Sequence, residues 1–130
     1  MTAPATEPLR ILNTDDYAPA RYARTKLLRQ AGFDVVEAET GAEALRQAVA
    51  TRPHVILLDV KLPDLDGYEV CRMFRQTPEL ARIPFVFLTA RLQEEGRLAE
   101  LGGHVAMIAK PFDPTELVAT VRRLIEGASA

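Results

Sequence analysis

Five short apolar segments alternate along the chain with longer segments in which apolar residues recur every three or four positions. The short segments are residues 9–14, 34–38, 54–59, 84–89 and 105–109. The middle ones are rich in Val, Ile and Phe and lack polar alternation, which is typical of strands covered on both faces in a parallel sheet. Strand–helix alternation with short connections implies right-handed crossovers. The pattern therefore predicts an α/β fold built on a doubly wound, five-stranded parallel sheet.

The helical segments are predicted from their apolar faces and from residues that mark helix ends. In the first helix, one face is formed by Ala20, Ala23, Leu27 and Ala31. Gly32 is placed to end this helix, because glycine readily adopts the left-handed conformation. The segment 91–101 gives the weakest helix signal, since Gly96 interrupts a poor apolar rhythm.

Three later helices have clear start signals. Thr40 and Glu43 fit a capping box, in which each side chain accepts a backbone N–H bond. Asp66 could open the third helix in the same way, and Asp113 followed by proline is a strong start for the last helix. Asp64 and Asp66 are accordingly interpreted as turn and cap residues rather than as ligands.

Composition fits one domain, which we expect at residues 9–126 between flexible tails at 1–8 and 127–130. The net charge of −2 does not favour binding to nucleic acid or to a membrane. No apolar run approaches the ~20 residues that span a bilayer, and the N-terminus lacks the pattern of a signal peptide. The single cysteine, Cys71, cannot form an internal disulfide, which fits a cytoplasmic location.

Charged residues stand where three of the predicted strands end: the pair Asp15 and Asp16, then Asp59, then Lys110. Open parallel sheets bind ligands at the carboxyl ends of their strands. Three carboxylates and one ammonium gathered there would repel one another or lose hydration unless a cation and an anion bound among them. Taken singly, each has a structural interpretation: helix caps for the acid pair, a turn with Pro63 for Asp59, and a solvated side chain for the lysine.

These positions belong to four segments in fixed order, ILNTDD, ILLDVKLPDLDG, IPFVFLTA and IAKPFDP. Together the segments resemble the receiver domain of two-component response regulators over residues 9–126, nearly the whole chain. The resemblance implies a flavodoxin-like (βα)5 fold with strand order 2-1-3-4-5. It implies a signalling phosphoacceptor that catalyses only its own phosphorylation and dephosphorylation. The donor would be a sensor histidine kinase, a phosphotransfer protein or a small phosphodonor.

The resemblance also implies the roles of the site residues. Asp59 would be the nucleophile and become a phosphoaspartate. Mg²⁺, or Mn²⁺ in its place, would be held by Asp15, Asp16, Asp59 and the backbone carbonyl of Lys61, with Asp16 bound directly and Asp15 either directly or through water. Water and phosphate oxygens would complete its coordination.

A second set of residues would contact the phosphoryl oxygens and change position when Asp59 is phosphorylated. Lys110 would pair first with Asp59 and then with the phosphoryl group, to which Thr89 would donate its hydroxyl. Thr89 and Ala90 would form the switch loop. Pro111 suggests a cis bond after the lysine, which would aim the ammonium inward.

Two features concern the output of the switch. Receivers usually carry an aromatic residue three positions before the lysine, where this chain has Met107. A flexible thioether does not need two discrete positions, so we expect the signal to run through the segment 91–101. Lys61 and Arg91 flank the phosphate, and we expect one of them to tune the phosphate lifetime; the alternative is that both point to solvent.

The resemblance implies that a downstream protein, not identified by the sequence, is a partner. It also allows a homodimer that forms through the face made of residues 91–101, residues 105–109 and the last helix. Two other functions are alternatives. One is a receiver-like interaction module that is never phosphorylated, which the intact acids and lysine disfavour. The other is an aspartate-nucleophile phosphatase, which wants a second acid two residues after its nucleophile, where this chain has Lys61.

Overall fold

The structure, a computed structural model, describes residues 8–90, 101 and 104–129. The predicted helix at 91–101 falls almost wholly outside the described residues, as does the N-terminal tail up to residue 7. No helix of the described part is long and apolar enough to cross a membrane.

Five parallel strands form one sheet in the order β2-β1-β3-β4-β5, which confirms the predicted fold and strand order. The strands are β1 (Arg10–Thr14), β2 (Asp34–Ala38), β3 (Val55–Asp59), β4 (Phe85–Thr89) and β5 (Val105–Ala109). The helices are α1 (Ala18–Gln30), α2 (Gly41–Thr51), α3 (Gly67–Arg75) and α4 (Pro114–Ser129), with a 3₁₀ turn, η1, at Pro78–Leu80. The last helix, α4, extends through residues 127–129 of the expected C-terminal tail.

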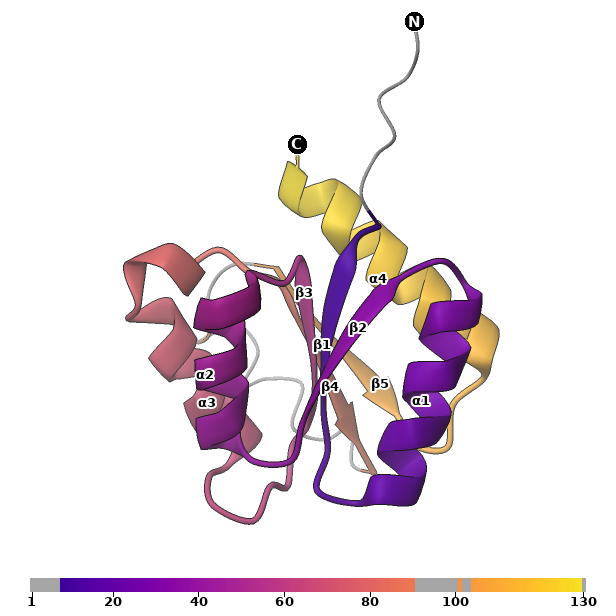
Figure 1. Ribbon diagram of the computed structural model, residues 1–130, viewed down its shortest axis with the longest axis horizontal. Coiled ribbons are helices and arrows are strands. Elements are labelled where there is room, and N and C mark those ends of the chain that lie inside the picture. Colours follow the sequence, from indigo (N-terminus) through magenta and orange to yellow (C-terminus); the bar gives the residue numbers. More distant parts are fainter. Residues whose placement is uncertain (1–7, 91–100, 102–103, 130) are drawn as a thin grey trace, which may run out of the picture.

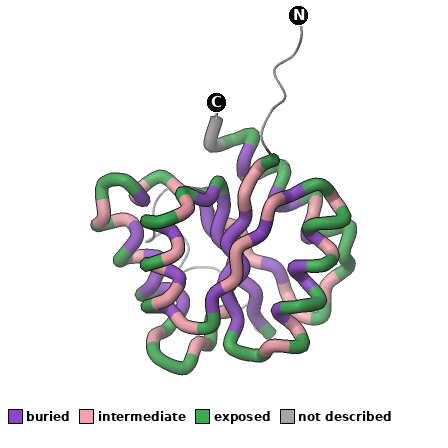
Figure 2. Tube along the Cα trace, in the orientation of Figure 1, coloured by how far each residue is buried: buried purple, intermediate pink, exposed green. Residues whose placement is uncertain are grey.

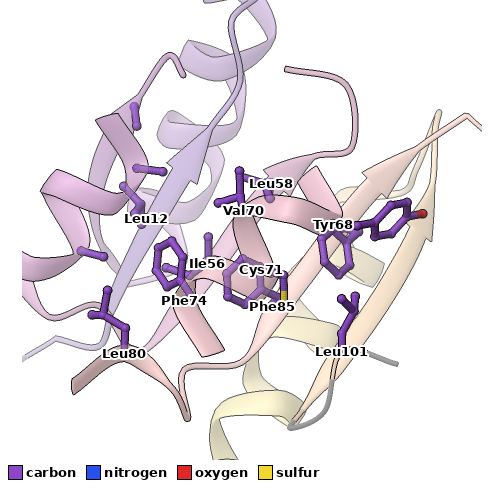
Figure 3. Close-up of a cluster of buried hydrophobic side chains, with 14 of the residues drawn as sticks. Leu12, Ile56, Leu58, Tyr68, Val70, Cys71, Phe74, Leu80, Phe85 and Leu101 are labelled. Carbon is purple, nitrogen blue, oxygen red and sulfur yellow. The ribbon is translucent and has the colours of Figure 1, made fainter. Parts of the chain in front are cut away.

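The helices cover both faces of the sheet, with α2 and α3 on one side and α1 and α4 on the other (Figure 1). Alternate strand residues point to opposite faces, so each side has its own core. The inner strands β1, β3 and β4 are the most buried part of the chain (Figure 2). Leu12, Ile56 and Phe85 pack under α2 and α3 (Figure 3). Ile11 and Leu57 belong to the core under α1 and α4.

The buried face of α1 agrees with the predicted one only in part, since Leu27 and Ala31 pack against the core as partly buried residues. Ala23 is exposed, and the helix instead buries Arg21, Arg24, Thr25 and Leu28. The physical reason lies in β1, where the fully buried Asn13 faces α1 and offers polar partners to the helix. Only Leu28 contributes an apolar side chain to the core from this buried set.

The other helix starts follow the sequence signals. Thr40 accepts a hydrogen bond from the backbone N–H of Glu43 at 3.0 Å, and Asp66 accepts one from Tyr68 at 2.7 Å. Asp64 has a role that sequence alone did not specify: its carboxylate accepts the N–H groups of Gly41 and Ala42 at 2.9 and 3.0 Å. It thereby caps α2 from the loop after β3, and confirms the structural interpretation given to it.

Candidate functional site

The predicted site residues meet in one cleft at the carboxyl edge of the sheet. Its volume is about 410 Å³. Among its lining residues are Asp15, Asp16, Asp59, Lys61, Thr89, Ala90 and Lys110. The cleft therefore gathers residues from the ends of β1, β3, β4 and β5, as the strand topology requires.

Asp59 is the last residue of β3, and its side chain is 14% exposed at the floor of the cleft. One carboxylate oxygen is ion-paired with the ammonium of Lys110, which follows β5. The other oxygen accepts the backbone N–H of Lys61 at 2.9 Å. The peptide bond between Lys110 and Pro111 is cis, as predicted. Asp59 is thus held by two donors from opposite sides and faces the cleft.

The start of α3 fixes the backbone around Asp59 by close approach. The N–H of Gly67 donates to the carbonyl of Val60 at 2.8 Å. A Cβ atom on Gly67 would lie 3.0 Å from the carbonyl oxygen of Asp59 and 3.0 Å from Cα of Val60. Both neighbours are backbone atoms, so only glycine allows the helix to lie this close to the strand end.

The two acids after β1 are in different environments. Asp16 is exposed, and its carboxylate has no hydrogen-bond or ion-pair partner in the described part of the chain. The Asp15 side chain is almost completely buried. One of its oxygens accepts the N–H of Tyr17 at 2.9 Å, and the other forms a 2.7 Å ion pair with Arg24. The alternative interpretation of these acids as helix caps is not realised, because Tyr17 is the N-cap of α1 and no side chain caps it.

The partners of Asp15 form a buried polar network that the sequence interpretation missed. Arg24 Nε donates to the side-chain oxygen of Asn13 at 3.1 Å. The Asn13 amide nitrogen in turn donates to Thr25 at 3.0 Å and to the carbonyl of Arg21 at 2.9 Å. A signal was present in the sequence, since Asn13 lies two positions before Asp15 on the same strand face and Arg24 precedes Leu28 by one helical turn.

The donor set suits a hard divalent cation such as Mg²⁺. Three or more His, Cys, Asp or Glu side chains do not converge on a common metal position anywhere in the described residues. Mg²⁺ does not require such a cage, because it keeps several waters and binds through one or two carboxylates. The cleft offers the carboxylates of Asp16 and Asp59 on adjacent strand ends. Those residues fit the ion, with Lys61 beside them.

The other predicted residues are placed as follows. Thr89 is buried at the end of β4 and lines the cleft beside the exposed Ala90. Met107 is half-buried on β5, pairs with Phe87 of β4, and packs against the core under α2 and α3. The Lys61 residue is exposed at the rim of the cleft. Arg91 lies outside the described residues.

Residues 11–122 match the family model of the response regulator receiver domain. The response regulator MprA of Mycobacterium sp. (strain KMS) is 39% identical over 123 residues, which are 94% of this chain and 53% of that protein. The alkaline phosphatase synthesis transcriptional regulatory protein PhoP of Bacillus subtilis is 41% identical over 100 residues, 75% of this chain and 40% of that protein. The chain thus spans about half the length of these curated relatives, or less.

Solved structures agree with this match. The chemotaxis response regulator CheY4 of Vibrio cholerae superposes with a TM-score of 0.83 at 29% identity, covering 91% of this chain and 99% of that chain. The receiver domain of sensor histidine kinase PA1611 from Pseudomonas aeruginosa PAO1 gives a TM-score of 0.82 at 32% identity, covering 92% and 99%. That neighbour is described with a magnesium ion coordinated in its active site cleft.

Proposed function

The chain belongs to the response regulator receiver domain family, and we propose that it acts as a phosphoacceptor switch with Asp59 as the phosphorylated residue. The observation that carries the proposal is the cleft itself. It combines a carboxylate held by Lys110 with a neighbouring carboxylate on the next strand end, Asp16, which is unpaired among the described residues. A nucleophile, a compensating cation and an acid for a metal ion are the parts that phosphoryl transfer requires.

In the proposed reaction a carboxylate oxygen of Asp59 forms a bond to phosphorus. The bond from phosphorus to the donor breaks at the same centre, and its electron pair remains on the imidazole nitrogen of a kinase phosphohistidine or on the acetate of acetyl phosphate. Lys110 is already paired with Asp59, so its ammonium is in place to follow the phosphoryl oxygens as charge moves onto them. The buried Thr89 hydroxyl is the proposed donor from the β4 side.

Bound Mg²⁺ would supply charge neutralisation between the attacking carboxylate and the phosphoryl oxygens. Asp16, Asp59 and the backbone carbonyl of Lys61 are the residues proposed to hold it, with Asp15 next to them. The chain's own contribution is to orient Asp59. The N–H of Lys61 and the ammonium of Lys110 bind its two oxygens separately, which limits rotation of the carboxylate before the donor arrives.

Phosphorylation would add about −1.5 to −2 charges and strong hydrogen-bond acceptors at the end of β3. We propose that this draws Lys110 and Thr89 toward the phosphate and shifts the β5–α4 surface between two populations. The backbone links the two groups, since Lys110 N–H donates to the Thr89 carbonyl at 2.8 Å. A sensor kinase upstream and a protein bound at the β5–α4 surface are the proposed partners, and a homodimer through that surface is the alternative.

Acetyl phosphate with Mg²⁺, followed by separation on a phosphate-affinity gel, tests the proposal. Wild type should show a slower band that Asp59→Asn lacks. Asp64→Asn is the matched control, because Asp64 is a nearby acid that caps α2 and does not line the cleft; it should shift as wild type does. Absence of a shifted band in wild type with both acetyl phosphate and phosphorylated kinases would refute the phosphoacceptor role and favour an unphosphorylated interaction module.

The proposed tuning of phosphate lifetime can be tested on the same phosphorylated protein. Lys61 is exposed and lines the cleft, so Lys61→Ala removes a charge from the site that the attacking water would enter. The decay rate of the phosphorylated band should change, whereas Lys26→Ala on the outer face of α1 should leave it unchanged. Equal decay rates in wild type and Lys61→Ala would contradict a role for this residue. The other tuning candidate, Arg91, is tested by the same decay measurement on Arg91→Ala.

A further inference from the structure

Arg24 binds one of the acids expected at the metal site. Its guanidinium forms a 2.7 Å ion pair with Asp15, and the two side chains are only 7% and 3% exposed. The second Asp15 oxygen accepts the N–H of Tyr17. Both carboxylate oxygens are therefore engaged inside the protein. Asp16, one residue later, has no such partner in the described part of the chain.

The guanidinium is itself held in place. Arg24 Nε donates to Asn13 on β1, and Asn13 is fixed by its two further hydrogen bonds to α1. Arg21 adds a 2.8 Å bond to the backbone carbonyl of Asp15. A planar guanidinium fixed at two of its nitrogens has little freedom to leave its partner. The Arg24–Asp15 ion pair is therefore a fixed part of the β1–α1 interface.

We infer that Arg24 is a resident counter-cation that withholds the Asp15 carboxylate from the divalent metal. The inference rests on the proposed Mg²⁺ site and deepens it. It divides the acid pair after β1 between two tasks. Asp16 binds the ion, and Asp15 anchors α1 to the end of β1 with its charge already neutralised.

The charge count gives the direction of the effect. Apart from the exposed Lys61 at the rim, three carboxylates at the site face two ion-paired cations, Arg24 and Lys110, which leaves one net negative charge among these five groups. Removing the guanidinium leaves two net negative charges and frees an acid that lines the cleft. A unit charge a few ångströms away at an effective dielectric constant of about 20 is worth more than 1 kcal/mol. We therefore expect about tenfold tighter Mg²⁺ binding, equivalent to about 1.4 kcal/mol.

The test variant should not leave the buried Asn13 side chain without a partner. Arg24→Leu alone would strand the carbonyl oxygen of Asn13, so the main variant is Asn13→Val with Arg24→Leu, which places apolar groups on both elements. Arg24→Lys keeps the charge at this position. Lys26→Leu is the matched control, since it removes one positive charge from the exposed face of the same helix without contact to the site.

Two measurements read metal binding without any phosphorylation assay. Isothermal titration with MgCl₂ should give a dissociation constant about tenfold lower for the double variant than for wild type, with Arg24→Lys and Lys26→Leu within about threefold of wild type. The rise in melting temperature caused by a fixed Mg²⁺ concentration should be larger in the double variant. Circular dichroism establishes that each variant is folded.

Substitution of the acids provides an independent arm. Asp16→Asn should abolish Mg²⁺ binding, whereas Asp15→Asn should leave the dissociation constant within about threefold of wild type while lowering stability. An unchanged constant in the double variant, or equal losses in Asp15→Asn and Asp16→Asn, overturns the inference while the phosphoacceptor role stands. Absence of Mg²⁺ binding in wild type and double variant alike overturns both the inference and the proposed metal site.

Discussion

Gly67 is a position where one methyl group should disturb the phosphoacceptor without touching its side chain. It is the first residue of α3. A Cβ atom there would lie 3.0 Å from the backbone oxygen of Asp59 and 3.0 and 3.2 Å from Cα and the oxygen of Val60. Backbone atoms of a central strand cannot move aside as a flexible side chain could. Gly67→Ala must therefore displace either the helix start or the end of β3.

The magnitude follows from two opposing terms. Alanine is favoured over glycine in a helix by about 0.5–1 kcal/mol, so a substitution without steric conflict would stabilise the protein. Forcing a methyl group into filled space costs about 1–3 kcal/mol. The steric term is larger, and we expect a net loss of about 1–2 kcal/mol in the free energy of unfolding. The sign of the change in the free energy of unfolding therefore distinguishes a steric conflict at Gly67 from a position with room for a methyl group.

Urea unfolding followed by circular dichroism measures the loss, and the initial rate of phosphorylation by acetyl phosphate measures the effect on the site. Gly32→Ala is the matched control. Gly32 has a φ of +99° and no atom within 4 Å of its Cβ position. Alanine at position 32 would have to adopt a left-handed backbone conformation, which costs about 1–2 kcal/mol. This position is far from the cleft. Both variants should lose stability, but only Gly67→Ala should phosphorylate more slowly.

The reasoning fails if Gly67→Ala is as stable as wild type or more so. It also fails if its phosphorylation rate equals that of Gly32→Ala at matched stability. Either outcome would mean that the start of α3 moves freely relative to the end of β3. In that case the hydrogen bond from Gly67 to Val60 would not position Asp59.

Three further substitutions or probes test other parts of the structure. Burial raises the pKa of the Asp64 carboxyl, but the backbone N–H groups that it caps lower it overall, so Asp64→Ala should cost about 1 kcal/mol at neutral pH. Because the folded-state pKa is the lower one, that difference should disappear in urea titrations as the pH falls below about 4. Phe74→Ala should cost about 3–5 kcal/mol in the same assay, since this fully buried ring packs edge-on against Phe85; a loss below 1 kcal/mol would contradict that packing. Burial raises the pKa of the Cys71 thiol to about 11, so iodoacetamide should label it quickly only in denaturant, and fast labelling of the native protein would refute the placement.

The sheet and the main site residues could be predicted because their signals are local. The strands β3, β4 and β5 are almost continuous apolar runs, and Asp59 and Lys110 stand where two of those runs end. Parallel topology then brings strand ends together without any knowledge of side-chain packing. The cap at Asp66 is equally local, since its acceptor and donor are two residues apart.

The missed features depend on contacts between distant residues. Asp64 caps a helix that begins 23 residues earlier in the chain, and no pattern within either segment specifies that pairing. The sequence predicts the apolar face of α1 from three alanines and Leu27, because polar residues count as solvent-facing in an amphipathic pattern. Arg24 is buried only because Asn13 and Asp15 supply acceptors for it on β1. A buried charge needs such partners, so its position is a property of the pair of elements.

The two faces of the sheet therefore hold the site by different means. Under α2 and α3 an apolar core, with the rings of Phe74, Phe85 and Phe87 in contact, supports β3 and the close approach at Gly67. That packing is non-directional and tolerates changes of charge in the cleft. Under α1 the end of β1 is held by directional bonds through Arg24. Added negative charge at Asp59 should accordingly act electrostatically on the polar groups between β1 and α1. The apolar core under α2 and α3, which supports Asp59, should keep its packing when Asp59 is phosphorylated.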